Sequence, residues 1–272
     1  MQIEENTEDG LYYRSWKSNE PKAAIILIHG LGEHCQRYEH VAQALTEKGY
    51  SLYAMDLPGH GKSTGVRGHI DSFEVFTDAA LNLLKRVGQE KPELPKFILG
   101  HSMGGLIVSR FLLDHQDKVS GAMLSGPAIQ SPQEPPAWQV GLIKTIAKFI
   151  PTAKMLALDA SEVSRDPKVV EKYMNDPLIS KEKLSARFLV EMTNTMEDVK
   201  TKANEISLPI LIMHGSKDSM TSPSGSELLF NTCGSSVKTL ELYDGLYHEI
   251  LNEPEQNTVI NDILSWLKGQ TS

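Results

Sequence analysis

A serine within a glycine-rich turn is the first feature of this sequence that could do chemistry. Residues 100–105 read Gly-His-Ser-Met-Gly-Gly and stand between the apolar run 97–99 and the apolar stretch 106–113. A Gly-x-Ser-x-Gly pattern between a strand and a helix is typical of a tight, strained turn that lifts the serine hydroxyl above a sheet. The turn also puts Ser102 at a helix N-terminus, where free N–H groups favour developing negative charge. We therefore predict that Ser102 is a nucleophile.

Such a nucleophile needs a general base, and the base needs a carboxylate that fixes its tautomer. In enzymes built around this turn, the serine, the acid and the histidine follow one another along the chain. Of the nine histidines, only His248 follows every plausible late acid, and it lies in a glycine-containing loop after a predicted strand. The predicted acid is Asp218, shortly after the apolar run 210–213. Its rivals are Glu205, which precedes that run, and Asp244, which lies in the loop of the base.

Two backbone N–H groups are needed to stabilise the oxyanion of an acyl-transfer intermediate. One should belong to Met103, the residue after the nucleophile, and the other to the loop after an early buried strand. That loop, residues 29–34, reads His-Gly-Leu-Gly-Glu-His, so the second predicted donor is the N–H of Leu31. Glycines on both sides of Leu31 let the backbone approach a ligand closely. The alternative for this segment is an ordinary tight turn.

The histidines do not predict a metal site. His29 and His34 are five residues apart and lack a third ligand. His248 and Glu249 begin like a zinc-protease motif, but Asn252 stands where the second histidine is required. The predicted site therefore contains no metal.

Short apolar runs alternate with amphipathic stretches along most of the chain. The predicted strands are residues 11–16, 23–28, 51–55, 96–99, 121–124, 209–213 and 239–243. The predicted helices are residues 38–48, 73–87, 103–114, 224–230 and 255–267. Residues 23–28 are apolar throughout, as in a strand buried on both faces, whereas residues 11–16 are predicted to form an edge strand. The alternation predicts an α/β fold with a mostly parallel central sheet flanked by helices.

This alternation breaks between residues 127 and 206. The segment holds seven of the fourteen prolines, and only helical patterns stand between them. The simplest account is a core of residues 1–126 and 207–272, into which a helical cap of residues 127–206 is inserted after about the sixth strand.

Composition excludes several classes of protein. With 27 basic and 35 acidic residues, the 272-residue chain has a formal net charge of −8 and lacks the basic footprint of a nucleic-acid-binding protein. No apolar run approaches the roughly 20 residues that span a bilayer, and the N-terminus lacks the pattern of a signal peptide. Two cysteines, Cys35 and Cys233, are too few to staple such a chain and favour a reducing compartment. We therefore predict a cytoplasmic protein that does not bind nucleic acid.

Four motifs together resemble those of the monoacylglycerol lipases. Residues 29–38 match the HGxGEHxxRY stretch of that family, and residues 56–63 match its DxxGHGxS loop. Residues 100–105 match its GHSMGG turn, and residues 173–178 match the Y-x-x-DPL segment of its cap. The resemblance covers essentially the whole chain. The first and last motifs are the more specific, since many esterases share GHSMG.

The resemblance implies an α/β-hydrolase fold with a mobile lid, and hydrolysis of monoacylglycerols to glycerol and fatty acid without a cofactor. Matched by position, the catalytic triad is Ser102, Asp218 and His248, and the oxyanion hole is formed by Leu31 and Met103. Leucine at position 31 departs from the alanine or tyrosine that is frequent in relatives, but the reaction needs only its N–H.

A polar, glycerol-binding end of the pocket is also implied by the resemblance. Four residues fall where the family lines that end: Glu33, Arg37, His101 and Tyr173. The alternative is that these side chains pack behind the pocket, for instance with Arg37 paired to a carboxylate.

One helical stretch of the predicted cap is amphipathic. Residues 137–150 place Trp138, Leu142, Ile146 and Phe149 along one stripe, with lysines elsewhere. Such a helix either rests on a membrane surface and admits acyl chains or packs its stripe against the core. The predicted partners are therefore a small-molecule lipid ester and, through the cap, a peripheral membrane contact.

Other activities would use the same constellation of residues. A lysophospholipase, a general short- or medium-chain carboxylesterase and an acyltransferase would all form the same acyl-enzyme. A receptor of the same fold that binds a ligand without catalysis would be expected to have a damaged triad, and this triad is intact.

Overall fold

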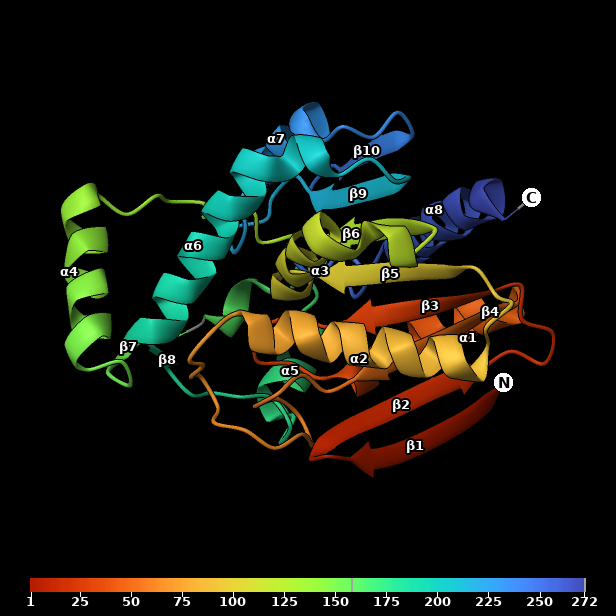
Figure 1. Ribbon diagram of the computed structural model, residues 1–272, viewed down its shortest axis with the longest axis horizontal. Helices are drawn as coiled ribbons and strands as arrows, with labels where there is room; N and C mark the ends of the chain where they lie inside the picture. The colour runs from red at the N-terminus through yellow and green to blue at the C-terminus, as the bar shows by residue number, and fades with distance from the viewer. Residues whose placement is uncertain (158, 272) are drawn as a thin grey trace.

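Eight strands form one sheet in the computed structural model, which describes residues 1–157 and 159–271 (Figure 1). The strands are β1 (Gln2–Glu8), β2 (Leu11–Lys17), β3 (Ala23–Ile28), β4 (Tyr50–Met55), β5 (Lys96–His101), β6 (Gly121–Ser125), β9 (Ile210–Gly215) and β10 (Lys238–Tyr243). Their order across the sheet is β1-β2-β4-β3-β5-β6-β9-β10. Pairing is antiparallel between β1, β2 and β4 and parallel from β4 to β10. The predicted mostly parallel sheet is therefore confirmed.

Helices cover both faces of this sheet (Figure 1). They are α1 (Glu39–Glu47), α2 (Glu74–Glu90), α3 (Met103–His115), α7 (Pro223–Thr232) and α8 (Gln256–Gln270), with the 3-10 helices η1 (Cys35–Tyr38) and η2 (Gln116–Lys118). On one face, α2, α3 and α7 contribute Phe76, Leu106 and Leu229 to a buried core. On the other, α1 and α8 contribute Leu45 and Ile263 to a second core. Burying both faces accounts for the continuous apolar runs of the central strands.

The edge of the sheet differs from the prediction. Residues 11–16 are predicted as an edge strand, but β2 lies one place inside the edge because β1 pairs with it. All seven residues of β1 are exposed, and their sequence is Gln-Ile-Glu-Glu-Asn-Thr-Glu. A strand exposed on both faces lacks the apolar–polar alternation of a half-buried strand, so the sequence pattern does not reveal it.

The segment between β6 and β9 holds a further group of elements. They are α4 (Ala137–Phe149), β7 (Lys154–Leu156), η3 (Ala160–Glu162), α5 (Pro167–Asn175), β8 (Leu184–Ser185), α6 (Ala186–Lys202) and η4 (Ala203–Glu205). The short strands β7 and β8 pair with each other, which corrects the expectation of helical elements alone. At three and two residues, they are too short to give a periodic signal. α6 packs against α3, and α4 packs against α6 at the margin of the molecule (Figure 1).

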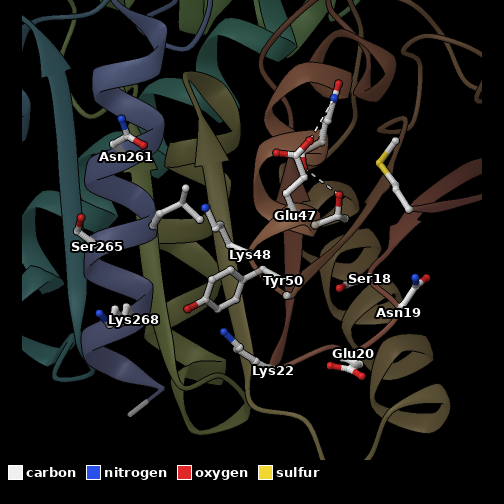
Figure 2. A pocket seen from close by; sticks show the side chains of 15 residues that line it. Ser18, Asn19, Glu20, Lys22, Glu47, Lys48, Tyr50, Asn261, Ser265 and Lys268 are labelled. Carbon is white, nitrogen blue, oxygen red and sulfur yellow. Dashed lines mark hydrogen bonds between the residues drawn. The ribbon is translucent and has the colours of Figure 1, made fainter.

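A broad surface groove of about 1160 Å³ lies at the amino ends of the parallel strands (Figure 2). Lys22 and Tyr50, which precede β3 and begin β4, line it together with Lys48 after α1 and Ser265 of α8. Ser102 follows the carboxyl end of β5. The groove is therefore on the opposite edge of the sheet from the residues predicted to do chemistry.

Candidate active site

Ser102 occupies a strained turn between β5 and α3. Its φ of 56° and ψ of −119° fall outside the regions that residues other than glycine usually adopt. The turn closes because its neighbours lack side chains: a Cβ on Gly104 would stand 2.1 Å from the carbonyl oxygen of Ile28, and one on Gly100 would stand 2.4 Å from that of Gly104. The N–H of Ser102 donates to the carbonyl of Ser125 at 2.9 Å, which holds the turn against the next strand.

The structure brings Ser102, His248 and Asp218 into one hydrogen-bonded chain. The Ser102 hydroxyl donates to Nε2 of His248 at 2.8 Å, and Nδ1–H of His248 donates to Oδ2 of Asp218 at 2.7 Å. Asp218 follows β9 and His248 follows β10, so the parallel sheet delivers all three groups to its carboxyl edge. The rival acid Asp244 instead accepts from the hydroxyl of Ser216, at 3.2 Å.

Two backbone amides fix the carboxylate of Asp218. The N–H groups of Met220 and Thr221 donate to Oδ1 at 2.8 and 2.9 Å, which leaves Oδ2 for side-chain donors. Burial alone would raise the pKa of Asp218, but the charge and hydrogen bonds of two histidines outweigh it and hold this pKa well below its usual value. Asp218 is therefore ionised across the physiological range.

The pKa values of the two histidines near the nucleophile shift in opposite directions. Burial opposes charge on His248, but the carboxylate of Asp218 outweighs burial and raises the pKa of His248 above 6.5. His101 lies beside it, with ring centroids 4.9 Å apart. Burial and then the charge of His248 lower the pKa of His101 to about 4. His101 is thus neutral at pH 7, and its Nδ1–H donates to the carbonyl of Ser125 at 3.0 Å.

A cavity of about 80 Å³ opens in front of Ser102. Leu31 and Met103, the predicted oxyanion donors, both line it. Met103 begins α3, so its N–H belongs to the first turn and has no carbonyl partner within the helix. Residues from the segment between β6 and β9 close the cavity from above, namely Val163, Tyr173 and Met192.

Three charged side chains form a buried network at one end of this cavity. Glu33 and Glu249 line the cavity, and Arg37, which is not among the lining residues, contacts both of them. Arg37 Nη1 donates to Glu33 Oε2 and to Glu249 Oε1, and Nη2 donates to Glu249 Oε2, each at 2.6 Å. Burial raises the pKa of Glu33, but the guanidinium of Arg37, the nearby histidines and the hydrogen bond from Tyr38 together outweigh burial and lower the pKa to about 2. Glu33 Oε1 also accepts from the N–H of Gly30 at 2.6 Å and thereby orders the loop of Leu31.

Of the four residues expected at the polar end, the structure therefore places Glu33, His101 and Tyr173 on the cavity wall. Arg37 lies one layer back, with its guanidinium 4.6 Å from the ring centroid of Tyr173. The alternative to a place on the cavity wall was that Arg37 pairs with a carboxylate behind the pocket. Arg37 does pair with carboxylates, and it lies close to the cavity because both of them line it.

The sequence did not predict a role in the site for three residues near this chain of hydrogen bonds. Glu249 follows His248 directly, and its side chain turns to Arg37. Thr221 Oγ donates to Asp218 Oδ2 at 2.9 Å. His214 Nε2 lies 3.0 Å from the same oxygen. The position of His214 at the carboxyl end of a predicted strand, four residues before the acid, was the available signal.

Similarity to known proteins agrees with this arrangement. Residues 19–255 match the hydrolase family described as serine aminopeptidase, S33. The monoacylglycerol lipase of Mycolicibacterium smegmatis is 36% identical over 258 residues, which cover 94% of this chain and 92% of that protein. The chain belongs to the monoacylglycerol lipase family. The resemblance stated from the motifs is thus confirmed.

A solved structure and a further relative show the fold of this family and the different activities after which its members are named. The crystal structure of the Paleococcus ferrophilus monoacylglycerol lipase superposes with a TM-score of 0.86 at 32% identity, covering 99% of this chain and all of that one. This confirms the predicted α/β-hydrolase fold. Phospholipase YtpA of Bacillus subtilis is 32% identical over 252 residues, which cover 90% of this chain and 95% of that protein.

Within residues 1–157 and 159–271, no three or more His, Cys, Asp and Glu side chains gather in a way that could hold a metal ion. Over the same residues, none of the helices has the length and apolar character needed to cross a membrane. Cys35 and Cys233 are both buried and not joined in a disulfide.

Proposed function

We propose that the protein is a serine ester hydrolase that cleaves monoacylglycerols into glycerol and a fatty acid. The observation that carries the proposal is the hydrogen-bonded chain from Ser102 through His248 to Asp218, which opens into a cavity covered by cap residues. Membership of the family supports the class of substrate, since its relatives are named monoacylglycerol lipases.

In the proposed reaction, His248 Nε2 takes the hydroxyl proton of Ser102 as Oγ attacks the carbonyl carbon of the ester. The carbonyl electron pair moves to oxygen, and the N–H groups of Leu31 and Met103 stabilise the oxyanion. The ester C–O bond then breaks, and His248 gives its proton to the departing glycerol oxygen. Water attacks the acyl-enzyme in the same way and releases the fatty acid. Asp218 remains ionised and stabilises the imidazolium of His248 in both halves.

The lining of the cavity supports a substrate with an apolar and a polar end. Apolar side chains near Ser102 suit an acyl chain, and they come from Leu31, Ala128, Val163, Met192 and Met220. We assign Glu33, His101 and Tyr173 to the wall that receives the glycerol hydroxyls. Arg37 then serves to hold the two carboxylates of Glu33 and Glu249 in place.

The charge of the polar end favours a neutral head group over a phosphate. Glu33 and Glu249 bring two carboxylates to the single guanidinium of Arg37, so this buried network has one excess negative charge. A phosphate would add negative charge where solvent screens repulsion poorly. A neutral glycerol brings hydroxyls without that cost. This observation favours monoacylglycerols over lysophospholipids, while small neutral carboxylic esters stay compatible with the site.

We also propose that residues 127–206 form a cap on a core of residues 1–126 and 207–272, and that the cap contacts membranes peripherally. The support lies in α4, whose side chains Trp138 and Phe149 are 68% and 73% exposed. A helix with such an apolar face and exposed lysines is suited to a lipid surface. A cytoplasmic location is proposed as well, supported by two buried cysteines that form no disulfide.

Replacing the nucleophile tests the proposed class of enzyme. We expect Ser102→Ala to lower kcat for a monoacylglycerol by at least about a thousandfold and to abolish labelling by a fluorophosphonate probe. Ser120→Ala, at an exposed serine outside the site, is the matched control and should keep both properties. Retention of activity or labelling in Ser102→Ala would refute the assignment.

A panel of esters tests the proposed substrate. It compares 1- and 2-monoacylglycerols of several chain lengths with diacylglycerol, lysophosphatidylcholine and p-nitrophenyl esters. We expect kcat/KM to be highest for a monoacylglycerol. A higher value for lysophosphatidylcholine would overturn the substrate while leaving the serine-hydrolase chemistry standing.

A further inference from the structure

A second histidine contacts the same oxygen of Asp218 that His248 uses. His214 lies in β9, is fully buried, and places Nε2 3.0 Å from Asp218 Oδ2. Its other nitrogen, Nδ1, lies 2.7 Å from the hydroxyl oxygen of Ser226 on α7. The ring thus bridges a helix of the core and the acid of the proposed triad.

The chemistry of the two contacts fixes the direction of the hydrogen bonds. An ionised carboxylate only accepts, so the nitrogen of His214 that faces Asp218 must carry a proton. In the neutral imidazole the opposite nitrogen is then an acceptor, and the Ser226 hydroxyl is a donor that matches it. Together with the contacts of His248, these contacts link Ser226 through His214 and Asp218 to His248 and Ser102.

We propose that His214 is a positioning residue for the reaction: its Nε2–H holds Oδ2 of Asp218 in the direction of His248 and withdraws part of the negative charge from that oxygen. The inference rests on the proposed function, because it assigns a role within the same hydrogen-bonded chain. A phenylalanine would fill the same space at the end of β9 and would need no polar partners. The volume of the ring therefore does not account for a buried histidine here, whereas its contacts with Asp218 and Ser226 do.

Other groups around Asp218 do not replace this contact. Thr221 Oγ also reaches Oδ2, at 2.9 Å, but it lies 3.1 Å from the carbonyl of Gly126, and its single proton serves one of the two acceptors at a time. The two backbone amides act on Oδ1. His214 Nε2 also faces the carbonyl oxygen of Thr221, at 3.4 Å, but it lies closer to Asp218 Oδ2, at 3.0 Å, so the charged oxygen is its main acceptor.

The proposal predicts the sign of a change in the titration of His248. The titratable and charged groups that face His248 are its partner Asp218, the neighbouring ring of His101, and the carboxylates of Glu249 and Glu33. A donor on Oδ2 weakens the attraction of Asp218 for the imidazolium, so its removal raises the pKa of His248. His248 acts as base only when neutral, so the acidic limb of the kcat/KM profile then moves to higher pH.

The experiment compares the full-length wild type with His214→Phe, His214→Gln and Ser226→Ala. Phenylalanine keeps a ring but has no donor, whereas the side-chain amide of glutamine can donate from about the position of Nε2. Rates of p-nitrophenyl butyrate hydrolysis are measured from pH 5 to 9, and the titration of His248 is followed by NMR, which needs no turnover. Thermal unfolding of each variant reports the contribution of packing.

For His214→Phe we expect kcat to fall about tenfold with little change in KM, since a hydrogen bond to a charged group is lost. The acidic limb and the NMR titration should both move upward by about half a pH unit or more. His214→Gln should restore the position of both, and Ser226→Ala should give a smaller shift in the same direction. If His214→Phe loses only thermal stability and keeps the wild-type pH profile and titration, the inference is wrong.

Failure of the proposed function would look different. In that case the wild type itself would not hydrolyse esters or react with a fluorophosphonate. The NMR titration of His248 would still decide whether His214 acts on the Asp218–His248 pair. If His214→Phe does not fold, the comparison of His214→Gln with Ser226→Ala carries the test, because an unshifted titration in Ser226→Ala contradicts a fixed donor direction.

Discussion

Two segments of the same insertion meet the rest of the molecule in contrasting ways. The inner cap segment, residues 160–180, is joined by polar bonds to the loops that carry the active site. Asp176 Oδ2 lies 2.9 Å from Nε2 of His34, and Val163 accepts from the N–H of Glu249 at 2.8 Å. Arg165 reaches the fully buried carboxylate of Glu253 through its N–H and its Nε, at 2.8 and 2.9 Å.

The outer cap segment, residues 137–156, has the opposite character. Trp138, Phe149 and Ile150 are each at least 60% exposed, and Ala147 is the buried residue of α4. The helix leans on α6 and stands away from the sheet (Figure 1). The contrast indicates that the inner segment is a wall of the site, whereas the outer segment is an exposed apolar surface, as the proposed membrane contact would require.

The largest effect should come from the charge network where the inner cap segment meets the core. In Arg37→Leu, the carboxylates of Glu33 and Glu249 stay buried without their cation. We expect the free energy of unfolding to fall by about 3–5 kcal/mol, as when one partner of a buried ion pair is removed. Urea denaturation followed by circular dichroism measures the change.

Arg110→Leu is the matched control for that variant. Arg110 pairs with Asp114 and Asp198 near the surface, with 26% of its side chain exposed. Its loss should cost about 0–1 kcal/mol, since exposed ion pairs contribute little. If both variants lost the same free energy of unfolding, the buried network of Arg37 would contribute no more to stability than an ion pair near the surface.

A smaller effect is expected from the side-chain contact between the inner cap segment and the loop of Leu31, which the N–H of Ser180 also joins by donating to the carbonyl of Gly32 at 2.8 Å. Asp176→Ala removes the partner of His34 and a bond from the N–H of Leu178 at 2.8 Å. We expect a loss of about 1–2 kcal/mol in stability, in line with charge-assisted hydrogen bonds. We also expect a fall of about tenfold in kcat/KM, because the proposed oxyanion loop loses one of its supports.

The pH dependence of the Asp176 contact gives a second readout. Burial opposes ionisation of Asp176, but its contact with His34, the N–H of Leu178 and the charge of Arg37 together outweigh burial and lower the pKa of Asp176 below its ordinary value of 3.8. The contribution of Asp176 is therefore complete above pH 3.8 and is lost as the pH falls through the depressed value. The difference in stability between wild type and variant should shrink in acid. Asp71→Ala is the matched control, because it breaks the contact between His69 and Asp71, whose side chain is 99% exposed. We expect this variant to change neither the stability nor its dependence on pH.

Much of the core and the candidate site could be predicted from the sequence, because local rules determine them. Buried parallel strands such as β3 need continuous apolar runs, and the strained turn at Ser102 needs the glycines that surround it. Chain order and position after a strand were sufficient to select Asp218 and His248, which the structure brings together. The roles of these residues are still a prediction, as is the division into core and cap.

What the sequence did not reveal depends on contacts between distant segments. Glu249 and Arg37 are 212 residues apart, so no local pattern announces their pairing. His214 gains its significance only when β9 and α7 place it between Asp218 and Ser226. The sequence did not predict β1 for a different reason. Its backbone pairs with β2 while all its side chains are exposed, so it shows no alternation of apolar and polar residues.

The smallest effect on folding is expected in the outer cap segment. Trp138→Ser and Phe149→Ser together should change the free energy of unfolding by less than about 0.5 kcal/mol, because side chains exposed by 68% and 73% lose little contact. Hydrolysis of a water-soluble ester should be unchanged for the same reason. Association with phosphatidylcholine vesicles, measured by sedimentation, should instead fall by about tenfold or more, since two aromatic side chains no longer enter the bilayer interface. The matched control is Lys144→Ser on the same helix, which removes charge and leaves the apolar face intact. A large loss of stability in the double variant would show that the outer segment packs like the inner one, and the contrast between them would disappear.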